Sequence, residues 1–225
     1  MVLLAFFAKC YFNLKAPLLD DEVYYFIWSQ RPDFGYPEHG PFLPWIYAVL
    51  SPVLGQSPFA VRFFGLFGML MVSLSVFLFM KDRFGKTSAW LALFIYQVLP
   101  ATYTLSIVST IDTPMFIFGT FSLIFYSKGF FENKKFLYIG GFFLGIAALS
   151  KVSAIWLGIG MLFYVFISKK RKEYIKNLHI WLSFILATLI YSPFLLWNYF
   201  NDFPFFVTAT KLLTRESSLE SFFLF

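Results

Sequence analysis

Long apolar stretches recur along the whole chain, separated by short segments that hold most of its basic residues. They cover residues 59–80, 87–107, 113–127, 136–167 and 178–197, and a shorter apolar run occupies 1–14. A soluble domain cannot bury this much apolar surface, because most of its residues must face water. About 20 consecutive apolar residues are enough to cross a bilayer as a helix. The pattern therefore predicts an all-α polytopic membrane protein and excludes a cytosolic enzyme.

The composition excludes two further classes of protein and does not indicate a nucleic-acid partner. Of the 225 residues, 59% are hydrophobic, 24% are aromatic and 13% are charged, whereas a soluble domain averages about 25% charged residues. A disordered chain would be charged and poor in aromatics. A disulfide-built module is excluded because Cys10 is the single cysteine. The net charge of +6 does not indicate a nucleic-acid partner, because in a membrane protein the placement of basic residues matters more than their sum.

The longest apolar stretch is predicted to contain two spans. Residues 136–167 would form a helix of roughly 48 Å, which is too long for one crossing. Because Ser150-Lys151 interrupts the stretch, we divide it into 136–149 and 152–167. With 1–14 this gives about seven spans. The run at 1–14 is shorter than a full span and lacks the features of a signal peptide, so we expect the chain to begin late in its first helix.

The basic residues support this number of spans. Eleven of the eighteen Lys and Arg residues lie in the segments 81–86, 128–135 and 168–176. Seven spans place all three segments on one side, which the positive-inside rule makes cytoplasmic. Nine of the twelve acidic residues then fall on the outer side. If 136–167 were one span, this segregation would fail. We expect a multi-pass protein of the cell (inner) membrane.

The connection 15–58 falls on the predicted outer side and contains two aromatic-rich amphipathic segments. The first, 21–30, follows Asp20 as a candidate N-cap. The second, 41–50, has Pro41 at a position suited to the first turn of a helix. Tyr, Trp and Phe favour the membrane interface. We predict two interfacial helices lying on the outer surface.

Four polar groups on that side are candidate site residues, and each has a plainer alternative. The acidic cluster Asp20-Asp21-Glu22, next to Tyr24-Tyr25, needs a compensating cation, proton or ligand, unless its acids serve only the helix start. The turn 36–41 holds Glu38 and His39 side by side, or is simply a solvated turn. Asp112, which stands alone before Pro114, is either a site residue or only the acid at a helix start. Lys151 either extends its ammonium to the lipid headgroups or binds a phosphate.

These groups are expected at one membrane face. Carboxylates supply a general base or ligands for a divalent cation, for which Asp21, Glu38 and Asp112 are candidates. A lysine supplies a counter-charge for phosphate. A zinc site of several histidines is excluded, because His39 and His179 are predicted on opposite sides. Together the groups indicate chemistry on a lipid-linked phosphate compound at the outer face.

The order of these motifs resembles that of lipid-dependent GT-C glycosyltransferases. The nearest group is the dolichyl-phosphate-mannose protein mannosyltransferase-like family, which includes the aminoarabinose transferases of lipid A. The resemblance rests on the following motifs: Asp21-Glu22-x-Tyr24-Tyr25, Trp28, Tyr36-x-Glu38-His39-x-Pro41, Ile111-Asp112-Thr113-Pro114, Leu149-Ser150-Lys151 and Pro193-Phe194-Leu195-Leu196-Trp197-Asn198. It extends over nearly the whole chain.

The resemblance implies a role for each matching residue. Asp21, paired with Glu22, would be catalytic, and Lys151 would hold the phosphate of the sugar donor. The other substrate-binding residues would be Tyr24, Glu38, His39 and Asp112, with a divalent cation as an open question. Gly40 stands where many members have proline, so we expect a looser turn. Members run to several hundred residues, so we expect this chain to be the N-terminal membrane module, lacking the variable C-terminal part.

The implied activity is transfer of a sugar from a polyprenyl-phosphate-linked donor to an acceptor on the outer face, with inversion. Membrane lipids and the lipid-linked donor would be its partners, and the sequence leaves the acceptor open. Two alternatives remain, namely a transporter or flippase for lipid-linked intermediates and a non-catalytic subunit of the same fold. Transporters place ionisable groups near the bilayer midplane, so acids predicted at the outer surface favour the enzyme.

Overall fold

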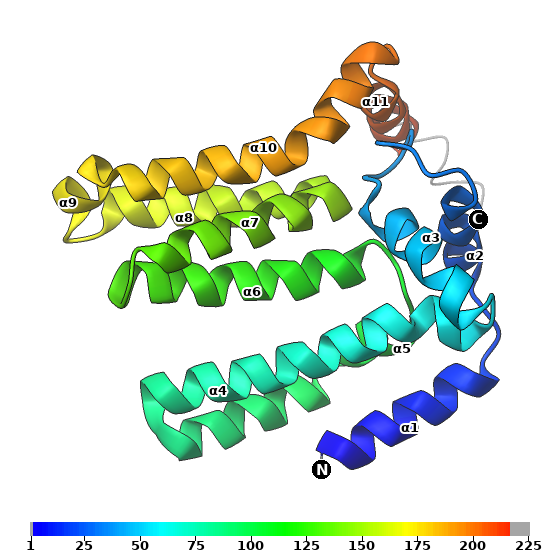
Figure 1. The fold of residues 1–225 in the computed structure, drawn as a ribbon, viewed down its shortest axis with the longest axis horizontal. Coiled ribbons are helices and arrows are strands. Elements are labelled where there is room, and N and C mark those ends of the chain that lie inside the picture. The colour runs from blue at the N-terminus through cyan, green and yellow to red at the C-terminus, as the bar shows by residue number, and fades with distance from the viewer. Residues whose placement is uncertain (1, 217–225) are drawn as a thin grey trace.

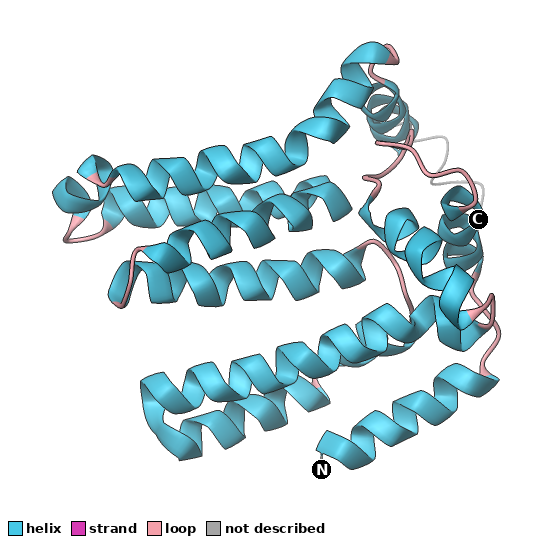
Figure 2. Cartoon of the chain, viewed as in Figure 1, coloured by secondary structure: helices cyan, strands magenta, loops and turns pink. Residues whose placement is uncertain are grey.

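The computed structural model describes residues 2–216, and those residues fold into helices joined by short loops (Figures 1 and 2). The helices are α1 (Val2–Lys15), α2 (Asp20–Ser29), α3 (Phe42–Leu54), α4 (Pro58–Val98), α5 (Pro100–Ile107), α6 (Asp112–Phe131), α7 (Lys135–Ser150), the 3₁₀ turn η1 (Val152–Ala154), α8 (Ile155–Ile167), α9 (Arg171–Lys176), α10 (Leu178–Phe200) and α11 (Pro204–Glu216). Helices therefore occupy all seven segments predicted as spans. Among the described residues, α4, α6 and α10 are long and apolar enough to cross a membrane.

Helix α4 is a hairpin of two arms rather than one straight rod. Gly85 has φ 84° and ψ 172°, which lies outside the helical region, and the chain reverses there (Figure 1). Glycine tolerates this backbone because it has no Cβ. The two arms correspond to the predicted spans 59–80 and 87–107, with α5 completing the second. The expected loop at 81–86 is thus a tight break inside a helical hairpin.

The long apolar stretch 136–167 is divided where the sequence predicted. Helix α7 ends at Ser150, and Lys151 is extended, with φ −147° and ψ 128°. The chain resumes in η1 and α8. Helices α7 and α8 hold 16 and 13 residues, which is shorter than the roughly 20 residues of a full crossing.

The two ends of the helix bundle differ in charge. The break at Gly85, the turn between α6 and α7, and helix α9 lie at one end, at the left of Figure 1. These are the three basic segments, so we call this the basic end. Helices α2, α3 and α11 lie at the opposite end, which we call the site end. The bundle therefore gathers the three basic segments at one end, as predicted.

Small residues bring the helices of the core close together. At Gly141 an added Cβ would overlap the carbonyl of Ser183 in α10, and at Gly145 it would approach the carbonyl of Ala187 to 2.8 Å. Both glycines of this Gly-x-x-x-Gly pair thus face α10, which explains the close packing of α7 on that helix. Helix α7 packs on α6 from its other side, where Ser122 donates to the carbonyl of Gly140 at 2.9 Å.

Two predicted helix starts are corrected by one residue, and two helices, α9 and α11, had no sequence prediction. The N-cap of α2 is Leu19, with Asp20 as the first helical residue, so Asp20 is not the cap. Pro41 is the N-cap of α3, which begins at Phe42. Helix α11, after an unusual turn with positive φ at Asp202 and Phe203, had no sequence prediction.

Candidate functional site

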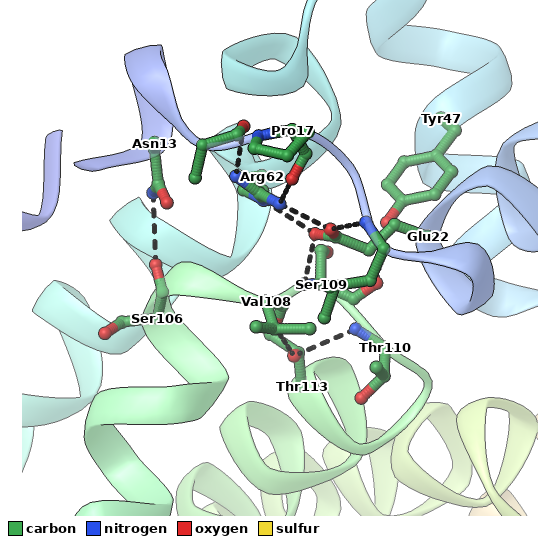
Figure 3. A network of polar contacts seen from close by, with 12 residues as sticks. Asn13, Pro17, Glu22, Tyr47, Arg62, Ser106, Val108, Ser109, Thr110 and Thr113 are labelled. Carbon is green, nitrogen blue, oxygen red and sulfur yellow. Dashed lines mark hydrogen bonds and ion pairs between the residues drawn. The ribbon is translucent and has the colours of Figure 1, made fainter. Parts of the chain in front are cut away.

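A buried ion pair anchors the acidic motif of α2 at the site end. Arg62, in the first arm of α4, donates from Nε to Glu22 Oε1 at 2.7 Å and from Nη2 to Glu22 Oε2 at 2.6 Å. Their side chains are 2% and 0% exposed. Such a fork-to-carboxylate pair is strong and fixes the geometry of both groups. Figure 3 shows the pair at the centre of a polar network.

The remaining hydrogen bonds of this pair join three separate parts of the chain. Glu22 accepts the backbone N–H of Leu19 and that of Ser109, both at 2.9 Å. Arg62 also donates to the carbonyls of Ala16 at 3.1 Å and Pro17 at 2.7 Å. The start of α2, the start of α4 and the loop before α6 are thereby held together (Figure 3).

The adjacent acids Asp21 and Glu22 therefore have opposite environments. Asp21 is exposed, whereas Glu22 is buried with both oxygens occupied. The sequence motif predicted the two acids as a catalytic pair, and Arg62 was not among the predicted residues. A signal for Arg62 was present, because it is a basic residue in the first turns of an apolar span, at the end that the positive-inside bias disfavours.

Aromatic stacking and backbone contacts hold the turn that carries Glu38 and His39. The rings of Trp28 and Tyr36 stack at 4.4 Å with an interplanar angle of 2°. The hydroxyl of Tyr36 bonds the carbonyls of Trp28 and Arg31 at 3.1 and 3.2 Å. The turn itself is closed by the bond from Tyr36 N–H to the His39 carbonyl at 3.2 Å.

Two glycines let this turn press against the two late motifs. A Cβ on Gly40 would overlap the carbonyl of Leu149, next to Lys151, and one on Gly35 would overlap the ring of Trp197. We expected Gly40 to loosen the turn. That expectation was wrong, because the missing side chain allows a backbone contact that fixes the turn against the end of α7.

Asp112 and Lys151 form the second ion pair of the site. Lys151 Nζ donates to Asp112 Oδ1 at 2.7 Å, and the two side chains are 35% and 41% exposed. Asp112 is the first residue of α6, and Lys151 is the extended residue after α7. The break in the apolar stretch thus brings the lysine to the carboxylate at the start of α6. Both side chains remain partly exposed on the surface of the protein.

His39 lies close enough to Asp21, Glu38, Asp112 and Lys151 for all four charges to affect its pKa. Burial lowers the pKa of His39, with Lys151 adding to the effect, while Glu38, Asp112 and Asp21 oppose it. Neighbouring Tyr25 shows the same convergence, because burial and then Asp21, Asp112 and Glu38 raise its pKa. Burial, and then the charge and hydrogen bond of Glu38, raise the pKa of Tyr24. The structure thus brings together the predicted residues other than Glu22.

A cavity of about 330 Å³ opens beside this group. Glu38, His39 and Lys151 line it together with Ser153, and Phe205 and Thr208 of α11 form its other wall. Helix α11, which had no sequence prediction, is therefore part of the site. Asn198 positions α11, because its Oδ1 accepts the N–H of Phe205 at 3.2 Å and its carbonyl accepts that of Phe203 at 2.8 Å.

The candidate metal ligands do not form a closed set. Among the described residues, no three His, Cys, Asp or Glu side chains come close enough to hold one ion. Asp112 is paired with Lys151, and Glu38 lies close enough to Tyr24 to raise its pKa. Because a hard cation needs several oxygen ligands, these residues alone do not fit a divalent cation.

Comparisons with known proteins identify a similar fold and a family. A fold comparison found the crystal structure of ArnT from Cupriavidus metallidurans in the apo state, with a TM-score of 0.74 and 18% sequence identity. The match covers 91% of this chain and 42% of that one, so the chain spans less than half the length of ArnT. No curated protein sequence matches the chain. The sequence profile of the dolichyl-phosphate-mannose-protein mannosyltransferase family matches residues 38–197, from the turn acid to the tryptophan of the late motif. The chain therefore belongs to the dolichyl-phosphate-mannose-protein mannosyltransferase family.

Proposed function

We propose that this protein is a GT-C membrane glycosyltransferase that moves a sugar from a polyprenyl-phosphate donor to an acceptor at the outer face. The observation that supports it best is the convergence of Asp21, Glu38, Asp112 and Lys151 around His39, beside an open cavity. These residues come from separate motifs, and family membership adds the class of reaction. Neither the site geometry nor the family identifies the sugar or the acceptor.

Lys151 is the proposed ligand of the donor phosphate. Lys151 lines the cavity, and among the described residues its ion-pair partner is Asp112, in a pair that is partly exposed. An entering phosphate competes with Asp112 for the ammonium, and the lysine then neutralises the charge that grows on the leaving phosphate. Asp112 keeps the lysine in place before the donor arrives.

Asp21 is the proposed general base. It is exposed at the first turn of α2, and the pKa of Tyr25 responds to its charge together with that of Asp112. The acceptor oxygen attacks C1 of the sugar while its proton passes to the Asp21 carboxylate. The bond from C1 to the phosphate oxygen breaks, and the polyprenyl phosphate leaves with the electron pair. A single displacement of this kind inverts the configuration at C1.

The other motif residues have supporting roles in this proposal. Glu38, Tyr24 and His39 bind sugar hydroxyl groups, since a carboxylate, a phenol and a neutral imidazole offer both acceptors and donors. Glu22 is assigned to structure, because Arg62, Leu19 and Ser109 occupy its carboxylate. No step is assigned to a metal ion.

We propose that all seven helical segments cross the membrane, with the basic end in the cytoplasm and residues 1–225 forming one membrane module. The loops 15–58 and 201–203 would then face outward. Single cysteines at Asp33 and Asp202 should react with a membrane-impermeant maleimide from outside, and cysteines at Lys134 and Lys170 from inside, after the native Cys10 is replaced by serine. Labelling of Asp33 and Lys170 from the same side would disprove this topology.

The activity is tested by incubating membranes that contain the protein with a panel of radiolabelled polyprenyl-phosphate sugars. Label should move from the lipid phosphate to a second product, and Asp21→Asn should stop this transfer. A transporter would instead move the intact labelled lipid between leaflets with its sugar–phosphate bond unbroken. A non-catalytic subunit would give neither result. Either outcome would contradict the proposed function.

A further inference from the structure

An apolar cavity of about 240 Å³ lies far from the candidate site, between α4, α6 and α7. Its walls include Leu78, Phe79, Phe121, Phe125 and Phe143, and Lys128 is its one charged lining residue. The lining residues of α6 span Phe121 to Lys128, or roughly 10 Å along the helix axis. Lys128 lies in the last turn of α6, so the charge is confined to the basic end.

The cavity exists because α4 and α6 diverge. Toward the site end they touch through small residues, since a Cβ on Gly65 would approach Thr113 Cγ2 to 3.0 Å and one on Gly68 would overlap Ile117. Toward the basic end the ribbons separate in Figure 1, and the cavity lies on that side of these contacts. The aromatic walls leave this space unfilled by the described residues.

A second basic side chain lies close to the cavity lining. The Arg83 guanidinium lies 5.9 Å from the ring centre of Phe79, which lines the cavity, and 5.3 Å from that of Phe131. Arg83 pairs with Glu132 at 3.0 Å, whereas Lys128 has no carboxylate partner among the described residues. The segments 81–86 and 128–135, at the same end of the bundle, hold six basic and two acidic residues.

We propose that this cavity binds one anionic phospholipid, with an acyl chain between α4 and α6 and its phosphate at Lys128. An anionic phospholipid matches the lining of the cavity. Its apolar tail would lie against the aromatic walls toward the bilayer centre, and its phosphate would lie at Lys128 at the basic end. Basic pockets between helices on the cytoplasmic side bind anionic headgroups. The Lys128 ammonium lies 5.9 Å from the ring centre of Phe136 and has no carboxylate partner among the described residues, so a buried apolar helix would give it no counter-charge. The proposal requires membrane embedding and does not depend on sugar transfer.

Native mass spectrometry of the full chain, titrated with phosphatidylglycerol or phosphatidylcholine of identical acyl chains, tests this site. We expect one phosphatidylglycerol to bind at least about fivefold more tightly than phosphatidylcholine, the factor that one basic residue near a membrane supplies. Lys128→Gln should remove most of that preference. Lys134→Gln is the matched control, because Lys134 is exposed on the same end but does not line the cavity.

A second variant tests the acyl chain separately. Ser75→Leu places a larger apolar side chain in the cavity lining without changing charge, and it should weaken both lipids by a similar factor. Thermal unfolding confirms that each variant is folded. Equal binding of the two lipids by the wild-type protein, equal effects of Lys128→Gln and Lys134→Gln, or unchanged binding by Ser75→Leu would each overturn the proposal.

Discussion

Arg62 and Glu22 form a buried bidentate ion pair that ties the acidic motif of α2 to the first arm of α4. The same carboxylate accepts the backbone N–H of Ser109, three residues before Asp112. One side chain therefore sets the positions of both Asp21, its neighbour in sequence, and the loop that leads to Asp112. The pair determines where the proposed catalytic groups stand without itself facing the cavity.

Breaking this pair should destabilise the fold. Removing one partner leaves the other charge buried and uncompensated, which typically costs about 3–5 kcal/mol. Glu22→Gln and Arg62→Met should each lower the midpoint of thermal unfolding in detergent. The double variant should lose less than the sum of the two, because neither charge is then left alone. Asp20→Asn, at an exposed neighbour, is the control, and an equal effect of Asp20→Asn and Glu22→Gln would contradict the assignment.

Asp21→Asn should abolish sugar transfer while the protein stays folded and inserted. The amide has nearly the shape of the carboxylate but cannot accept the acceptor proton, and loss of general-base catalysis typically costs about 10²–10⁴-fold in rate. Asp20→Asn should be milder, since Asp20 begins α2 and its charge serves mainly the helix dipole. Turnover of the two variants is compared in membranes. Full activity of Asp21→Asn beside an inactive Asp20→Asn would shift the assignment by one residue.

Lys151→Ala should weaken binding of a polyprenyl-phosphate donor by about 10–100-fold, the range for a lost hydrogen bond to a charged group. Asp112 would then also face the donor phosphate without its counter-charge. Lys151→Arg should recover part of the affinity, because charge is kept while geometry changes. Equilibrium binding of a labelled donor measures both, with exposed Lys15→Ala as the control. Unchanged affinity of Lys151→Ala would leave Lys151 only a snorkelling role.

Gly40→Ala should damage the site although it adds one methyl group. That group would overlap the Leu149 carbonyl, and relief of such overpacking typically costs about 1–3 kcal/mol through backbone shifts. The shift would move Glu38 and His39 away from Lys151. The rate of sugar transfer should therefore fall by more than the loss of folded protein accounts for. Gly160→Ala is the matched control, because a Cβ there meets no atom within 4 Å. Equal activity of the two variants would show that the turn does not depend on this contact.

His39 should make the folded protein less stable on mild acidification. Burial lowers its pKa in the folded state below the ordinary value of about 6.5. The unfolded chain therefore binds the proton more readily, and stability falls as the pH drops through about 6.5 until the folded-state pKa is passed. The unfolding midpoint is measured between about pH 7.5 and 5.5. His39→Asn should flatten this slope relative to His179→Asn, and identical slopes would argue against a buried neutral His39.

Sequence patterns predicted most of the architecture because they depend on local properties. A run of apolar residues favours a membrane helix wherever it occurs, and a cluster of lysines marks one end of the bundle without reference to any partner. The break at Lys151 was predictable for the same reason, since a charge within an apolar stretch is costly by itself. Helix α11 was not predicted because it is amphipathic rather than apolar throughout, so it does not stand out as a membrane span. Its position depends on Asn198 and on a turn with positive φ, which no local pattern indicates.

The sequence by itself determined which residue types the site contains, and the tertiary structure decided what each of them contacts. Asp21 and Glu22 are adjacent acids, and the sequence does not show which of them is buried. The roughly 100° turn between successive helical residues points one outward and the other at Arg62, 40 positions away. In the same way Lys151 meets Asp112 across 39 positions, and Gly40 meets the backbone of Leu149. Contacts between distant segments depend on how the helices pack, and no local pattern of residue types encodes them.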